Sequence, residues 1–217
     1  MALRARLQRS GLQARAQALG QLGVTRPHVW KGRAGLLDLD ANMHMNNASL
    51  VYCAELARWH LSGTNGLLDQ VLRQGWLFMV GSQHFLYRAP VPPFAPYEIH
   101  TVVDAIDDKW LYMRHTFLRP AKGDKPAKVY AEGTVKAIIV KRGGGKISPK
   151  EVIESLGVPP SVLSEIAQRE AVDRCETFAA LDEYLHQDAR ALVNGEESRQ
   201  ARAAGRNSGT GAADARP

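Results

Sequence analysis

One helix, whose apolar residues cover most of its circumference, constrains the fold of this 217-residue chain more than any other feature. Residues 47–62 read NASLVYCAELARWHLS, with Asn47 as the expected N-cap and Gly63 as the expected stop. The polar residues form one narrow stripe of Ser49, Glu55 and Arg58, with His60 on another side. A surface helix shows a single apolar stripe, so this pattern predicts a helix enclosed by other elements, with Leu56 among its buried residues.

Segments rich in β-branched and aromatic residues surround this helix in the sequence. A strand is expected at 26–37, and after a short helical piece at 66–73 further strands are expected at 76–88, 97–106, 109–119 and 127–141. Short turns such as Asp107-Asp108 join consecutive strands, which indicates an antiparallel sheet. A sheet that curls around the helix is the natural way to bury it, so the sequence predicts an α+β fold.

Three further segments flank the predicted core domain of residues 24–147. Residues 1–23 alternate arginine with leucine and alanine and contain no acid, which is typical of a mitochondrial transit peptide and predicts a matrix location. A disordered basic arm is the alternative interpretation. Residues 148–193 open with Ser148-Pro149-Lys150-Glu151, the spacing of a capping box, and predict a helical extension. Residues 194–217 form a low-complexity tail with few apolar residues.

The positive charge of the chain is concentrated near its beginning. The net charge is +6, yet residues 1–37 hold seven basic residues and no acid. Residues 38–217 are close to neutral, which argues against direct nucleic-acid binding by the folded core. No apolar run reaches the roughly 18 residues of a transmembrane helix. The histidines and two cysteines lack metal-ligand spacing, and Gly143-Gly144-Gly145 lacks the features of a phosphate-binding loop, so no metal or cofactor is expected.

The stretch Asp38-Leu39-Asp40-Ala41-Asn42-Met43-His44-Met45-Asn46-Asn47 runs directly into the buried helix. The first turn of a helix offers free N–H groups and a positive dipole end, which can polarise a carbonyl and stabilise an oxyanion. A neighbouring carboxylate can activate water or attack the carbonyl carbon. The stretch therefore indicates acyl-transfer chemistry. The alternative is structural: Asp38 and Asp40 would form Asx turns, and Glu55 would pair with Arg58.

The spacing D-x-D-x-x-x-H-x-N-N, followed by a tyrosine-containing helix with Ala-Arg, resembles the hotdog-fold thioesterases of the 4-hydroxybenzoyl-CoA thioesterase type. The HMNN variant and Gly145-Lys146-Ile147-Ser148-Pro149-Lys150-Glu151-Val152 resemble the thioesterase superfamily member 6-like branch. The resemblance covers residues 26–158. It implies a hotdog fold, an acyl-CoA or acyl-carrier thioester as substrate, and a side-by-side homodimer or hotdog heterodimer with active sites near the interface.

The resemblance also implies roles for particular residues. Asp40 matches the catalytic carboxylate of the family, and the loop with His44, Asn46 and Asn47 lines the thioester site. Met43 stands where many active members have a glycine whose N–H lies near the thioester oxygen. The implied catalytic residues are Asp40, His44, Asn47 and the helix-borne Glu55, and the implied substrate-binding residues are Met43, Asn46, Ser82 and His84, the last two from the next strand.

Two functions follow from these observations. The first is hydrolysis of an acyl thioester. The second is a catalytically idle hotdog subunit of a large mitochondrial complex, such as a respiratory complex, ATP synthase or ribosome. Met43 in place of glycine and the helical extension favour the second function.

Overall fold

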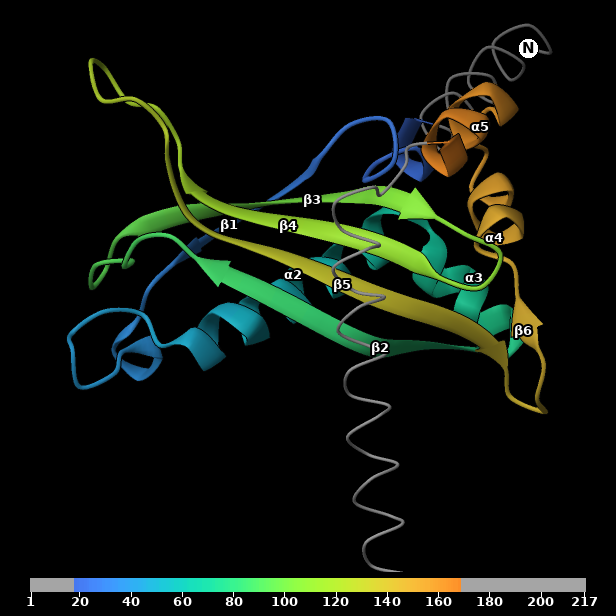
Figure 1. Ribbon diagram of the computed structural model, residues 1–217, viewed down its shortest axis with the longest axis horizontal. Coiled ribbons are helices and arrows are strands. Elements are labelled where there is room, and N and C mark those ends of the chain that lie inside the picture. The colour runs from blue at the N-terminus through green and yellow to red at the C-terminus, as the bar shows by residue number, and fades with distance from the viewer. Residues whose placement is uncertain (1–17, 169–217) are drawn as a thin grey trace, which may run out of the picture. The chain divides into compact units, whose positions relative to one another are not determined.

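The computed structural model describes residues 18–168, so the predictions for the tail at 194–217, for most of the basic segment and for the end of the helical extension lie outside the described residues. Six antiparallel strands form one sheet in the order β1-β3-β4-β5-β2, with β6 paired to β5 (Figure 1). The strands are β1 His28–Arg33, β2 Trp76–Tyr87, β3 Pro96–Ile106, β4 Leu111–Arg119, β5 Lys128–Lys141 and β6 Lys146–Ile147. The helices are η1 Leu36–Asp38, α2 Asn47–Asn65, α3 Leu67–Gln74, α4 Pro149–Ser155 and α5 Pro160–Gln168.

Helix α2 lies against one face of the curled sheet (Figure 1). Its buried residues, Leu50, Cys53, Ala54 and Ala57, form one core cluster with strand residues that include Ile99, Phe117 and Ala131. The order of elements and the sheet curled around a central helix confirm the predicted α+β fold. Along β3 buried and half-buried residues alternate, so one face of this strand packs into the core.

The ends of α2 differ from the predicted ends by a few residues. Its N-cap is Asn46, which has an extended backbone. The side-chain oxygen of Asn46 accepts the Ala48 N–H at 2.8 Å, as expected of an N-cap. The expectation for Asn47 was wrong because Asn47 is already the first helical residue. The helix continues through Gly63 and ends at Gly66, which adopts φ +88°, the left-handed conformation that a helix-ending glycine favours.

Within residues 18–168 the far side of α2 is not covered. Tyr52, Leu56 and Trp59 are 61%, 36% and 52% exposed, so the predictions of complete enclosure of the helix and of a buried Leu56 were wrong for this part of the chain. The opposite error concerns Arg58, which was expected in the polar stripe and is only 4% exposed. The sheet covers one flank of the helix, and that flank includes Arg58.

Helices α4 and α5 contribute to the same core as the strands. Val152, Ile153, Leu163 and Ile166 are buried, the last three of them among apolar residues of β3 and β4. Proline occupies the first turn of α4, as expected, but the Ser148 side chain makes no capping hydrogen bond, so the predicted capping box does not form. No helix within residues 18–168 is long and apolar enough to cross a membrane.

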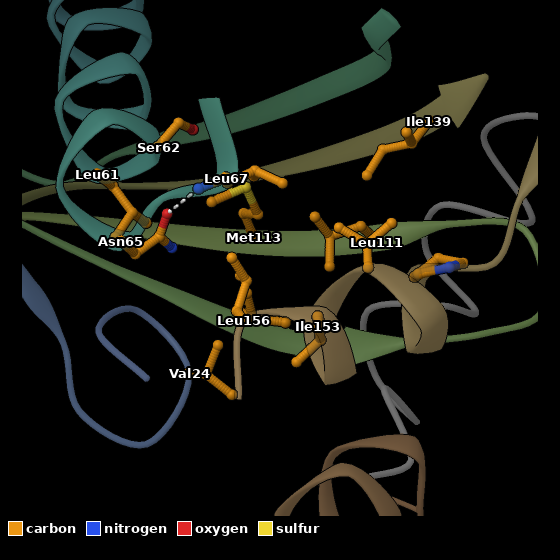
Figure 2. Close-up of a pocket in the computed structure, with 13 residues that line it drawn as sticks. Val24, Leu61, Ser62, Asn65, Leu67, Leu111, Met113, Ile139, Ile153 and Leu156 are labelled. Atoms are coloured by element: carbon orange, nitrogen blue, oxygen red, sulfur yellow. Dashed lines mark hydrogen bonds between the residues drawn. The ribbon is translucent and has the colours of Figure 1, made fainter. Parts of the chain in front are cut away.

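A small cavity of about 20 Å³ lies where α2 meets α3, as Figure 2 shows. Its wall is mostly apolar and includes Val24, Leu61 and Met113. Asn65 fixes the junction of the two helices, because its Oδ1 accepts the Leu67 N–H at 3.1 Å and its Nδ2 donates to a backbone carbonyl at 3.3 Å. This buried amide explains why the chain turns here and does not continue as one helix.

Candidate functional site

The loop before α2 folds back on itself and holds Asp40 beside His44. The Asp40 N–H donates to the His44 carbonyl at 3.0 Å, and the Asn46 N–H donates to the Asp38 carbonyl at 2.7 Å. These two hydrogen bonds form a short antiparallel ladder that ends at the N-cap of α2. The loop therefore places a carboxylate and an imidazole next to the first turn of the helix, as the sequence predicted.

The Asp40 carboxylate has one engaged oxygen. Its Oδ1 accepts the Asn42 N–H at 2.8 Å, an Asx turn, and lies 3.6 Å from Nδ1 of His44. No partner of Oδ2 lies among residues 18–168. The Asp40 and His44 side chains are 25% and 36% exposed, so solvent and a ligand can reach them. The turn role and a chemical role are thus compatible, because each uses a different oxygen.

The first turn of α2 keeps two unpaired N–H groups. The Asn46 side chain satisfies Ala48, and the Leu50 N–H donates to the Asn46 carbonyl at 3.1 Å. The N–H groups of Asn47 and Ser49 have no acceptor among the described residues. Together with the positive end of the helix dipole, these two groups can stabilise negative charge that develops on a carbonyl oxygen.

Met43 adopts a left-handed backbone conformation, which favours glycine. Its φ is +57°, in the left-handed region that costs a residue with a Cβ about 1 kcal/mol or more. Its N–H donates to the Asp40 carbonyl at 3.1 Å, and its side chain points outward, since the residue is 63% exposed. The turn therefore occupies the Met43 N–H, and the free N–H groups belong to α2.

Glu55 lies apart from this loop, about 12 Å along α2 from Asn47 by the rise of a helix. Its carboxylate forms an ion pair with Nη2 of Arg58. This pairing is the structural alternative that the sequence offered to a catalytic role for Glu55. The Glu55 side chain is 42% exposed and that of Arg58 only 5%. Asp40 and Glu55 therefore do not form one acid–base pair within this chain.

Ser82 and His84 do not face the same side of the sheet as α2, which corrects the expectation that they line the cleft. A β-bulge between Val80 and Ser82 shifts the alternation of β2 by one residue. After the bulge, Ser82 pairs with Lys136 and His84 with Thr134, and directly opposite residues share a face. Without the bulge Ser82 would follow Val80 toward the helix.

A buried polar network lies beneath α2 and was not predicted from the sequence. Nε2 of His115 lies 3.3 Å from Nη1 of Arg58, and its Nδ1 lies 3.0 Å from Oγ1 of Thr101. Arginine can only donate, so Nε2 accepts and the ring proton sits on Nδ1, directed at Thr101. Burial, and then the charge of Arg58, lower the pKa of His115 to about 3, so the ring is neutral at pH 7. The sequence feature that could have indicated this network is His115, which stands at an inward position of β4 between Met113 and Phe117.

Acid should destabilise the protein through His115. The pKa of its ring is about 3 in the folded chain against a usual 6.5, so below pH 6.5 the unfolded chain binds the extra proton. The stabilisation is complete above pH 6.5 and is lost as the pH falls toward 3, at roughly 1 kcal/mol per pH unit. Urea unfolding at pH 7, 5.5 and 4.5 measures this slope, which His115→Gln should reduce.

His84→Gln is the matched control, because His84 is an exposed histidine on another strand. Part of the slope should survive in His115→Gln, since burial and the neighbouring His60 also lower the pKa of His28. An identical slope in wild type and His115→Gln would contradict the neutral buried ring.

A curled antiparallel sheet around a central helix, with a carboxylate loop at the N-terminus of that helix, defines a hotdog protein of the thioesterase kind. Residues 34–166 match the family model of the Thioesterase-like superfamily, and the chain belongs to this superfamily. The resemblance inferred from the D-x-D-x-x-x-H-x-N-N stretch is thereby confirmed.

The chain has relatives among curated proteins and solved structures. It is 23% identical over 195 residues to Thioesterase poxG of Penicillium oxalicum, a match that covers 76% of this chain and 64% of that protein. It is 31% identical over 80 residues to Protein THEM6 of Drosophila melanogaster, covering 37% and 42%. The chain thus spans less than two thirds of either relative. The probable thioesterase YbaW from Escherichia coli superposes with a TM-score of 0.54 at 16% identity, over 59% of this chain and 94% of that one, and shows the shared fold.

Proposed function

We propose that this protein hydrolyses an acyl thioester carried by CoA or an acyl carrier. The observation that carries this proposal is the free oxygen of Asp40 beside a helix N-terminus with two unpaired N–H groups. The thioester oxygen would accept hydrogen bonds from Asn47 and Ser49, and Asp40 would take a proton from the attacking water. Collapse of the intermediate breaks the C–S bond, and the leaving thiolate takes up the proton. Direct attack by Asp40 on the carbonyl carbon is the other route that this geometry allows.

The experiment that tests this proposal is thiol release from a panel of acyl-CoA thioesters. The panel should run from short to long aliphatic chains and include an aromatic acyl group. Turnover above the rate in buffer, proportional to the amount of purified protein, is the expected result. Absence of thiol release from every member of the panel would sink the proposal.

The alternative role as an idle subunit of a mitochondrial complex has no support among the described residues or in the comparisons. Helices α4 and α5, the described part of the helical extension, bury apolar residues against the strands. We therefore put forward the hydrolase alone.

We propose that two hotdog subunits associate through β2 and the exposed side of α2. Within the described residues β2 pairs only with β5, so its other edge is open to a second strand. Val80 on β2, which faces the α2 side of the sheet, and Tyr52 on α2 are 40% and 61% exposed. Sedimentation should give the mass of a dimer, and Val80→Lys should shift it toward the monomer, whereas Val29→Lys on the opposite edge strand should not. A wild-type monomer at micromolar concentration would exclude this dimer.

A matrix location for this protein also remains our proposal, supported by the acid-free, arginine-rich composition of residues 1–23. Residues 1–30 fused to a fluorescent reporter should carry it to mitochondria. A diffuse cytosolic signal would remove the argument.

A further inference from the structure

Three neighbouring segments form one end of the sheet, at the left of Figure 1. They are residues 34–46, which contain the Asp40 loop, residues 88–95 between β2 and β3, and residues 120–127 between β4 and β5. The Met45 N–H donates to the Val91 carbonyl at 3.0 Å and joins the first two segments. Two N–H groups at the start of 88–95 donate to the Tyr130 carbonyl on β5 at 2.8 and 3.0 Å, which joins the second segment to the base of the third. We call this surface the loop end.

The loop end exposes large apolar side chains. Leu37 is fully exposed, and Leu36, Met43 and Phe94 are 70%, 63% and 52% exposed. Met43 and Phe94 both have a φ of +57° and are the two residues other than glycine with positive φ within residues 18–168. That conformation is uncommon for a bulky residue and persists only where the surroundings enforce it. Four exposed apolar side chains, two of them on strained backbone, favour a surface that an apolar partner covers.

The hairpin between β4 and β5 adds positive charge to the loop end. Its residues 119–128 read RPAKGDKPAK, with four basic residues and one acid. Lys122, Lys125 and Lys128 are exposed, and none of them forms an ion pair with another residue of the described range 18–168. The backbones of Lys122 and Lys125 exchange two hydrogen bonds, at 3.0 and 3.1 Å. The hairpin therefore holds unneutralised lysines on a narrow tip.

Nearby acidic side chains do little to offset this charge. Glu132 at the base of the hairpin is paired with Arg88 at 2.7 Å. The free oxygen of Asp40 and the side chain of Asp124 are the remaining negative groups that these loops present. Arg33 adds a cation directly beside the apolar surface, because its Nη1 donates to the Phe94 carbonyl at 2.6 Å. The exposed apolar side chains thus lie in a positively charged setting.

We propose that the loop end docks on the surface of an anionic lipid bilayer. The apolar side chains of residues 34–46 and 88–95 enter the headgroup layer, and the hairpin lysines contact lipid phosphates. Apolar anchors combined with basic residues are the features that hold a protein at an anionic membrane surface. Side chains that protrude from separate loops suit a soft lipid layer better than a protein surface, whose contacts are closely packed.

Docking brings the Asp40 site to the layer into which long acyl chains partition. The inference does not depend on the proposed hydrolysis, because docking is measured without a thioester.

Flotation of the full-length protein with vesicles tests the charged part of this surface. Wild type should bind vesicles of equal parts phosphatidylcholine and phosphatidylglycerol, and bind pure phosphatidylcholine much more weakly. Joint replacement of Lys122, Lys125 and Lys128 by glutamine should lower the affinity by about tenfold or more. The matched control replaces Lys141, Arg142 and Lys146 by glutamine. It removes the same charge from the turn between β5 and β6, at the opposite end of β5, and should bind as wild type does.

The basic residues 1–23 can also attract anionic lipid, but they are present in all of these proteins. Equal losses in the two triple variants would show attraction by overall charge and overturn the docking surface. Wild-type binding by the Lys122, Lys125 and Lys128 variant would assign the attraction to another part of the chain, with the same consequence.

A second pair of variants tests the apolar anchors. Leu37→Ser combined with Phe94→Asn should weaken vesicle binding by about tenfold. Asparagine is chosen because it tolerates positive φ. The loss should persist in high salt, which screens the lysines and not the apolar contacts. Leu72→Ser on α3 is the matched control, since Leu72 is 71% exposed and lies outside the loop end. Melting curves confirm that the variants are folded.

The remaining outcomes identify other occupants of the loop end. A wild-type protein that ignores anionic vesicles and binds acyl carrier protein in calorimetry would have an acidic protein as its partner, and the inference fails. If Leu37→Ser with Phe94→Asn dissociates a dimer in sedimentation, a second copy of the chain covers this surface, and the inference also fails. Docking without hydrolysis of any thioester supports the membrane surface and overturns the hydrolase, whereas hydrolysis without docking does the reverse.

Discussion

Replacing Asp40 by asparagine should lower kcat by about 10²–10⁴-fold on any thioester that the wild-type protein hydrolyses. Asparagine keeps the size of the side chain and an oxygen that can accept the Asn42 N–H, now held at 2.8 Å, so the turn should survive. It loses the negative charge and the basicity of the free oxygen. Thiol-release kinetics measure the loss, and an unchanged melting temperature shows that the fold is intact.

Asp38→Asn is the matched control for this substitution. Asp38 sits two residues earlier in the same loop, and its Oδ2 accepts the Gly35 N–H at 2.7 Å. That contact is a turn hydrogen bond that an amide oxygen can also make, so Asp38→Asn should retain most of the activity. Turnover that persists in Asp40→Asn would take Asp40 out of the reaction and direct attention to Glu55.

The sheet was predictable because its signals are local. Residues 127–141 show an uninterrupted β-rich pattern and form β5 at Lys128–Lys141, and Asp107 closes the turn to β4 by accepting the N–H groups of Lys109 and Trp110. The contact between Asp40 and His44 was equally local, since the two residues stand four positions apart in one tight loop. A short spacing limits the possible geometries, and here it was sufficient to predict that the two side chains lie in one loop.

The features that sequence missed depend on partners far along the chain. Gly81 lies in the bulge of β2, and a Cβ there would lie 2.7 Å from the ring of Trp110, a residue of the connection between β3 and β4. The bulge reverses the facing of Ser82, and no local pattern indicates it. Arg58 and His115 are likewise 57 residues apart in sequence. The sequence predicted an exposed Arg58. Its guanidinium is buried instead, and His115 on β4 supplies the acceptor for it.

Leu50→Ala should lower the free energy of unfolding by about 2–5 kcal/mol, the range for truncation of a buried leucine. Leu50 is 3% exposed and packs in the cluster between α2 and the sheet. Leu56→Ala, the matched control on the same helix, should cost less than about 1 kcal/mol in the monomer, because Leu56 is 36% exposed. Urea unfolding of both variants at low protein concentration measures the difference.

The dependence on protein concentration extends this comparison to the proposed dimer. A loss in the core acts on folding itself, so the cost of Leu50→Ala should be the same at every concentration. Leu56 lies on the side of α2 that we assign to the subunit interface, so its truncation should become more costly as the dimer becomes populated. Equal costs for the two variants at high dilution would place Leu56 in the monomer core and contradict the arrangement of α2 described above. A cost for Leu56→Ala that stays small at every concentration would instead remove this face of α2 from the interface.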